Sequence, residues 1–325
     1  MTIPRFWAEA RLQHREKRKQ ITVRRFGWSH TSEAEAEANA TTRATDALKR
    51  ILSGEKLLRR EPRQAYNGAE GVPIREEIIA EHGSVVITRN SYGALCLNTP
   101  DVLFADVDFH SDPHPGYGCG LGLLLMLPAF WAGIHFASLA AFFALAAVGF
   151  LLAFGLVRSL HRLSQTARGG PEKLAAGRIE AFLARHSDWR LRLYRTPAGL
   201  RVLATHRTFS PDEAEVAEFF RALGADPVYV TMCQRQKCFR ARVSPKPWRI
   251  GMTAHIKPRR GAWPVRPEAM SARKAWIASY HEKANDFASC RFEREAGSGG
   301  THETARRVLA LHDQLCRAES GLPIA

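Results

Sequence analysis

Two aspartates at the end of an apolar stretch are the residues of this chain best placed to do chemistry. In the run Val102–His110, Asp106, Asp108 and His110 alternate with apolar residues, so a strand would project these three side chains from one face. Carboxylates two residues apart at a strand end can bind Mg²⁺ or Mn²⁺ for phosphate chemistry. The alternative is a pair of solvated acids, because Asp-x-Asp is a short motif. We predict Mg²⁺ or Mn²⁺ as cofactor, with Asp106 and Asp108 as metal ligands and catalytic residues.

A turn and a basic stretch further along the chain are the other candidate parts of a site. Thr196–Gly199 separates two apolar runs and is typical of a hairpin turn, with glycine supplying a positive φ. The stretch Gln234–Arg249 is rich in Arg and Lys and contains Trp248. Its Arg240 and Arg242 would share one face of a strand, where they either bind phosphate or keep a solvated edge strand from aggregating. Trp248 either stacks on a base or packs beside Pro247.

The order of these motifs resembles the catalytic core of archaeo-eukaryotic primases and primase-polymerases. That family has an Asp-x-Asp strand that holds metals, then a helix and a hairpin of the type Ser/Thr-x-x-Gly-x-His that touches the incoming nucleotide. The resemblance implies that Asp106 and Asp108 are metal ligands. It also implies that Thr196, Gly199 and Arg201 contact triphosphate, within residues 84–118 and 171–250.

The chain departs from this family pattern at several points. Arg201 stands where the family has histidine; arginine can bind phosphate bidentately but cannot act as a neutral general base. The third family motif, an apolar strand ending in aspartate, has only Asp226 as a candidate. His110, Asp112 and His114 either extend the metal site or lie in a loop.

Charge and cysteine content limit the class of protein. Of the net charge of +15, little comes from residues 1–118, with 17 Lys and Arg against 16 Asp and Glu, whereas residues 158–325 carry 30 against 16. Such an excess suits nucleic acid, nucleotides or anionic lipid, and is also common in cytoplasmic parts of membrane proteins. The six cysteines form no tight framework, so we predict free thiols in a reducing compartment and no zinc site.

A long uncharged segment predicts a membrane hairpin. Residues 119–157 contain no Lys, Arg, Asp or Glu. One helix of that length would measure about 58 Å, nearly twice the roughly 30 Å hydrocarbon core, so two spans are expected. We place the turn at Ala132–Ser138; the first span, with Pro128, either crosses fully or is re-entrant. The arginines that follow predict insertion in the inner (cytoplasmic) membrane with both termini cytoplasmic.

The remaining pattern predicts how these motifs are positioned. Residues 1–65 are expected to be mostly helical. Alternating apolar residues predict strands at 85–88, 94–97, 102–109, 191–195, 200–205, 228–232 and 238–243. Capping and amphipathic patterns predict helices at 169–186, 210–223, 271–288 and 302–318.

These elements define the predicted architecture, an α+β cytoplasmic domain with an inserted two-helix transmembrane hairpin. Its parts are an N-terminal helical region (1–65), the first half of the α+β domain (66–118), the hairpin (119–157), the basic second half (158–260) and C-terminal helices (261–325).

Three functional hypotheses follow from the sequence. The first is a membrane-bound, nucleotidyltransferase-like domain that binds a divalent metal and nucleotide or nucleic-acid phosphate through Thr196, Gly199, Arg201, Arg240, Arg242 and Lys246. The second is a non-enzymatic membrane protein whose basic face binds anionic lipid or nucleic acid. The third is a nucleotide-sugar transferase that uses Asp-x-Asp, for which no further acid-base residue can be placed.

Overall fold

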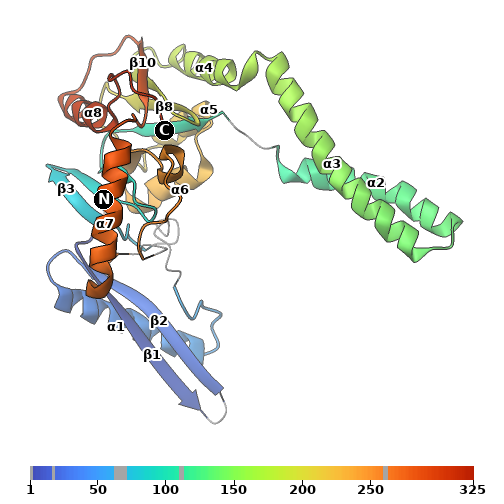
Figure 1. Cartoon of the computed structure of the whole chain (residues 1–325), viewed down its shortest axis with the longest axis horizontal. Helices are drawn as coiled ribbons and strands as arrows, with labels where there is room; N and C mark the ends of the chain where they lie inside the picture. The colour runs from blue at the N-terminus through green and yellow to red at the C-terminus, as the bar shows by residue number, and fades with distance from the viewer. Residues whose placement is uncertain (1–2, 17–18, 62–71, 110–112, 259–262) are drawn as a thin grey trace.

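The protein is a mixed α+β structure from which two long helices project (Figure 1). The computed structural model describes residues 3–16, 19–61, 72–109, 113–258 and 263–325. Within this part of the chain lie a two-stranded sheet, β1-β2, and two four-stranded sheets ordered β10-β7-β8-β6 and β3-β4-β5-β9. Neighbouring strands are antiparallel in all three sheets.

The strands are β1 (Phe6–Glu16), β2 (Lys19–Ser29), β3 (Glu77–His82), β4 (Val85–Arg89), β5 (Leu95–Thr99), β6 (Phe104–Asp108), β7 (Arg190–Arg195), β8 (Gly199–Ala204), β9 (Phe239–Arg242) and β10 (Arg291–Gly297). The helices are α1 (Glu33–Leu52), α2 (Pro115–His135), α3 (Leu139–Ala167), α4 (Gly170–Leu183), α5 (Ala214–Leu223), α6 (Pro227–Gln236), α7 (Pro267–Ala284) and α8 (Glu303–Cys316), with a 3-10 turn, η2, at Pro247–Ile250. Most of the predicted strands and helices are confirmed.

One hydrophobic core joins the two four-stranded sheets to helices α4, α5, α6 and α8. Apolar residues from each of these elements are buried in it, among them Ile87, Leu97, Phe104, Val107, Ile179, Phe182, Val202, Phe219, Met232 and Val308. Strand β6 pairs with β8 in one sheet and also contacts β9 of the other. The polar ends of β6, β8 and β9 are therefore held close together by apolar packing, the largest favourable contribution to folding.

Strands β1 and β2 form an antiparallel pair, where the sequence analysis expected helix. Strands β1 and β2 pair along their whole length, from Phe6 opposite Ser29 to Glu16 opposite Lys19, and α1 packs against them. Along β1 the side chains alternate between exposed and partly buried, a period of two that fits a strand with one covered face. Within residues 1–65 the helical prediction holds for α1 alone, and the boundary predicted at residue 65 lies outside the described residues.

Two elements in the second half also differ from the prediction. Val228–Met232 was expected to be a strand, but it lies in helix α6. Asp226 caps this helix, its side chain accepting a 2.9 Å hydrogen bond from the amide of Val228, and Pro227 fills the first turn. The C-terminal region contains strand β10 as well as helices, because Arg291–Gly297 pairs with β7 at the sheet edge.

Helices α2 and α3 pack against each other as a hairpin (Figure 1). The turn between them lies where it was predicted. Ala137 adopts a left-handed φ of 46°, and the Ser138 side chain caps α3 by accepting from the amide of Ala141. Both helices extend beyond the predicted spans, and Pro128 lies inside the continuous helix α2.

The outer surface of this hairpin is apolar. Large side chains such as Leu127, Trp131 and Leu151 are 67%, 66% and 76% exposed, an arrangement that water disfavours over so large a patch. At 21 and 29 residues, the helices measure about 32 and 44 Å. They could therefore span a membrane. Because β6 before the hairpin pairs with β8 after it, spanning helices would leave both segments on one side.

Gly199 is the tightest point of the sheet that carries the candidate site. A Cβ at this residue would lie 2.0 Å from the carbonyl oxygen of Val107 on β6. We expect Gly199→Ala to separate β8 from β6 and lower the midpoint of thermal unfolding. Gly177→Ala in helix α4, where a Cβ meets nothing within 4 Å, should stabilise by about 0.5–1 kcal/mol. Equal midpoints for both variants would contradict the close approach of the strands.

Candidate functional site

Register between β6 and β8 places the first aspartate of the motif against a buried arginine. Asp106 lies directly opposite Arg201, and Asp108 opposite Gly199. The Arg201 Nε and Nη2 atoms donate to the two carboxylate oxygens of Asp106 at 2.8 and 3.0 Å. Arg201 is only 2% exposed, so this bidentate pair is held inside the domain.

The other donors of Arg201 are also occupied. Nη1 donates to the carbonyl of Arg242 at 2.8 Å and lies 3.3 Å from Nε2 of His312. Four of the five N–H groups of the guanidinium therefore have partners. The family resemblance implied that Arg201 contacts triphosphate, but here its contacts position Asp106 and join β8 to β9 and α8.

A pocket of about 190 Å³ opens at the polar ends of these strands. Its lining includes residues predicted from four separate stretches of sequence: Asp106, Asp108, Thr196, Arg201, Asp226, Arg240, Arg242 and Lys246. Gly199 lies at the same edge, opposite Asp108. The structure thus brings the predicted site residues together around one cavity.

Three carboxylates make one part of the pocket acidic. Asp108 is exposed at one side, but partial burial of its carboxylate in the pocket raises its pKa, and the negative charges of Asp106 and Asp226 raise it further. Burial alone would also raise the pKa of Asp106, but the charge and hydrogen bonds of Arg201 lower it below its usual value. Asp226 reaches the pocket from the start of helix α6 rather than from a strand end. Such mutual repulsion among carboxylates is relieved by a bound cation.

Three cations make another part of the pocket basic. Burial lowers the pKa of Lys246, and the positive charges of Arg242 and Arg249 lower it further. The pKa of Arg249 is lowered for the same reasons, burial first and then the charge of Arg242. Arg249, which sequence reasoning did not select, comes from η2 and lines the pocket. An anion would relieve the repulsion among these groups.

Arg240 differs from its neighbours because its charge is already balanced. Its Nη2 atom contacts the Glu76 carboxylate oxygens at 2.6 and 2.8 Å, and Nη1 donates to Asn98 at 3.1 Å. Glu76 is only 4% exposed. The predicted role of Arg240 as a substrate ligand therefore competes with a buried ion pair that joins β9 to the segment before β3.

The turn that carries Thr196 is a hairpin turn, as predicted, but the expected positive φ at Gly199 is wrong. Glycine is needed there because of the close approach of the Val107 carbonyl oxygen, and not because of the backbone conformation. Thr196 and Gly199 exchange backbone hydrogen bonds of 2.9 and 3.3 Å, and the Thr196 hydroxyl accepts from the amide of Gly199 at 3.0 Å. Because the Thr196 hydroxyl is the acceptor in this bond, its own proton is available to another acceptor. Thr196 lines the pocket. His110 and Asp112 lie outside the described residues, and His114 caps helix α2 by accepting from the amide of Gly116.

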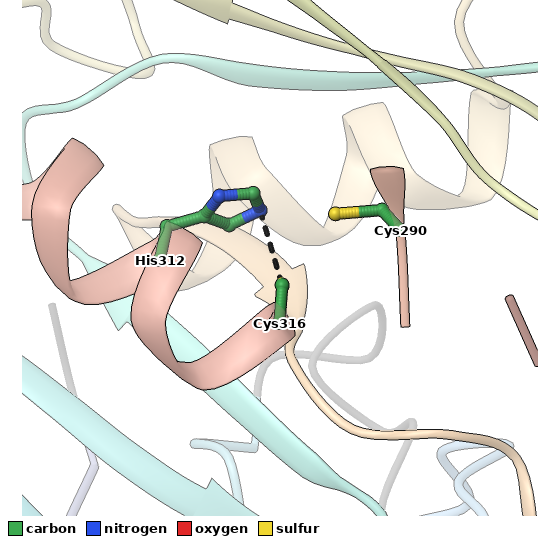
Figure 2. A group of neighbouring side chains, drawn as sticks. All are labelled: Cys290, His312 and Cys316. Carbon is green, nitrogen blue, oxygen red and sulfur yellow. Dashed lines mark hydrogen bonds between the residues drawn. The ribbon is translucent and has the colours of Figure 1, made fainter. Parts of the chain in front are cut away.

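Sequence reasoning missed a cluster of side chains behind Arg201. Cys290, His312 and Cys316 are all buried, and their potential ligand atoms lie within 4.8 Å of one another (Figure 2). The sequence contained one signal for it, the four-residue spacing of His312 and Cys316, which puts both on one helix face. Cys233 and Cys238 are the two cysteines with the closest spacing in the sequence; both are buried and neither joins such a cluster in the described part of the chain.

Comparison with protein-family models, with curated proteins and with solved structures finds no match to this chain. The primase resemblance therefore rests on the motifs alone.

The Asp106–Arg201 pair predicts a large effect of removing the arginine. Arg201→Gln leaves the Asp106 carboxylate without its partner, and breaking a buried pair in this way costs about 3–5 kcal/mol. Since the Asp106 side chain is 39% exposed, we expect a loss near the lower limit, about 3 kcal/mol, in denaturant unfolding. Arg221→Gln, at an exposed site on α5, is the control and should change stability little. If Arg201→Gln lowers the free energy of unfolding no more than the control Arg221→Gln does, the Asp106–Arg201 pair does not stabilise the fold.

Proposed function

We propose that the pocket binds a divalent cation together with the phosphates of a nucleotide, in a nucleotidyltransferase-like domain attached to a membrane. The observation that supports this most is that two groups of like charge share one cavity. Asp106, Asp108 and Asp226 repel one another, as do the cations Arg242 and Lys246. A metal–phosphate complex is a ligand that neutralises both groups at once.

The chemistry of the acidic group favours Mg²⁺ or Mn²⁺. Carboxylate oxygens are hard ligands, and these ions commonly use one or two carboxylates and complete their shell with water and substrate phosphate. Asp106 keeps lone pairs free beside its bonds to Arg201, because each carboxylate oxygen can accept more than one contact. Asp108 and Asp226 offer the remaining oxygens from an exposed position.

The basic group suits the phosphates of the same ligand. Lys246 offers three donors and Arg242 and Arg249 offer planar guanidinium groups, which match phosphate oxygens. In the proposed reaction a hydroxyl attacks the α-phosphorus of a nucleoside triphosphate. A new P–O bond forms as the bond to the α,β-bridging oxygen breaks, pyrophosphate leaves, and the hydroxyl proton passes to solvent. The metal and the cations would stabilise the charge that develops on the phosphate oxygens.

The helical hairpin suggests where this domain acts. Arg158, Arg162 and Arg168 lie on α3 and just after it, and such a cluster favours the cytoplasmic side of a membrane. The second hypothesis, a non-enzymatic protein whose basic face binds anionic lipid or nucleic acid, accounts for these arginines and for Lys246. It gives no reason for three carboxylates to meet in the same pocket.

The proposed metal site predicts opposite effects of one substitution. At neutral pH, Asp108→Asn removes repulsion from the metal-free pocket, so we expect a higher midpoint of thermal unfolding. The same change removes a metal ligand, so the stabilisation by Mn²⁺ should be lost. Asp286→Asn, at an exposed site outside the pocket, should change neither quantity. If Mn²⁺ stabilises Asp108→Asn as well as the unchanged protein, or stabilises neither, the metal site is wrong.

Trp248 provides a test of whether the ligand carries a base. This side chain is 57% exposed beside the pocket, 5.2 Å from the ring of Tyr92, and Lys246 Nζ lies 5.5 Å from its centre. Stacking of one base on an aromatic ring is worth about 1–3 kcal/mol. We therefore expect Trp248→Ala to weaken Mn²⁺-ATP binding about 5- to 150-fold.

Inorganic triphosphate separates base stacking from phosphate binding in this test. Its affinity should be the same in Trp248→Ala as in the unchanged protein, and Trp248→Phe should keep most of the ATP affinity. Calorimetric titration of the detergent-solubilised protein measures both ligands. Equal losses for ATP and triphosphate would assign Trp248 to packing instead.

A further inference from the structure

A cluster of three buried side chains, of a different chemistry from the carboxylates, lies behind the pocket. Cys290 lies just before strand β10, whereas His312 and Cys316 are one turn apart on helix α8. All three side chains are at most 1% exposed. Figure 2 shows the His312 ring and the Cys290 sulfur on either side of one small space, with Cys316 next to the ring.

The spacing of these atoms fits a tetrahedral ion. Zinc binds thiolate sulfur at about 2.3 Å and imidazole nitrogen at about 2.0–2.1 Å, so a tetrahedral site has S···N edges of about 3.6 Å. His312 Nε2 and Cys316 Sγ lie 3.4 Å apart, and the three potential ligand atoms lie within 4.8 Å of one another. A small inward movement of the Cys290 sulfur would complete the three-ligand face.

The surroundings of His312 are those of a metal ligand. Its Nδ1 atom lies 2.9 Å from Oδ1 of Asp313, and the other oxygen of Asp313 accepts from Arg192 at 2.9 Å. A carboxylate that holds Nδ1–H leaves Nε2 free to coordinate, which is the usual outer shell of a zinc-bound histidine. Nε2 is the ring atom that faces Cys316.

We propose that Cys290, His312 and Cys316 bind one zinc ion, with water as the fourth ligand. Two thiolates balance the charge of Zn²⁺, so a neutral complex replaces three buried polar side chains. Soft sulfur ligands select zinc over Mg²⁺ or Mn²⁺, which separates this site from the carboxylate pocket. The ion joins α8 to the start of β10 and so fixes the C-terminal segment behind Arg201.

Zinc binding changes one contact of the pocket. The single lone pair of His312 Nε2 cannot bind a metal and also accept from Arg201 Nη1, 3.3 Å away. Arg201 then keeps its bonds to Asp106 and to the carbonyl of Arg242. The proposal is independent of the proposed nucleotide site, because no pocket carboxylate belongs to the cluster.

The test measures metal in the full-length protein purified in detergent with a reductant and without a chelator. We expect about one zinc per chain by mass spectrometry of the metal, as one tetrahedral site requires. Cys290→Ser and Cys316→Ser should each lose most of it and unfold at lower temperature. Cys238→Ser, also a buried thiol, is the matched control and should keep the zinc. Asp108→Asn should keep it too, so failure of the pocket and failure of this site are distinguishable.

A second measurement covers variants that do not fold. Zinc is removed from the unchanged protein with a chelator and replaced with Co²⁺, which should give an intense sulfur-to-cobalt charge-transfer absorption that added zinc abolishes. The proposal is overturned if the protein contains no zinc and binds neither ion at micromolar concentration. It is also overturned if peptide mapping without reductant finds Cys290 and Cys316 joined as a disulfide.

Discussion

The buried ion pair between Asp106 and Arg201 is the interaction on which the candidate site depends. Taking a guanidinium out of water is costly unless nearly all of its donors are bonded. Arg201 meets this condition only because β6, β9 and α8 present acceptors to it together. The pair thereby fixes the register of β6 against β8, since a shift by one residue would turn Asp106 toward the apolar core.

The path of the chain imposes a second constraint. The two strands that form the ion pair are separated in sequence by the whole apolar hairpin, yet they are neighbours in one sheet. If the hairpin spans a membrane, an even number of crossings is needed to return the chain to the side from which it left. Two helices and a tight turn at Ser138 satisfy this requirement. The length of the uncharged segment predicted these two helices.

The parts of the fold that the sequence predicted are those set by local pattern. Strands β4 to β8 are either alternating or continuously apolar segments bounded by turn residues. A 39-residue stretch without charged residues is uncommon in soluble proteins. Most of the site residues came together because they lie on strands β6, β8 and β9 or just beyond them, whereas Asp226 reaches the pocket from the start of helix α6. Short sequence motifs therefore largely predicted the location of the pocket.

The parts that the sequence did not predict depend on partners distant in the chain. Residues of β1 such as Arg11 and Leu12 favour helix in isolation, and pairing with β2 overrides that preference. In α6 the β-branched run at Val228 suggested a strand, but the cap at Asp226 and the proline after it start a helix. The Cys290–His312–Cys316 cluster joins helix α8 to the residue just before β10, so the sequence spacing indicated only two of its three members.

Arg201 is buried between two sets of side chains that could each hold a metal, the carboxylates of the pocket and the Cys290–His312–Cys316 cluster. On one edge its guanidinium meets the Asp106 carboxylate, and on the other it meets the His312 imidazole. A positive charge there lowers the affinity of each group for a cation unless the group carries excess negative charge. In the two proposed sites, Asp108 and Asp226 would supply that excess in the pocket, and two thiolates would supply it in the cluster. The choice of cation would then follow from the ligands themselves, which are oxygen atoms in the pocket and sulfur and nitrogen atoms in the cluster.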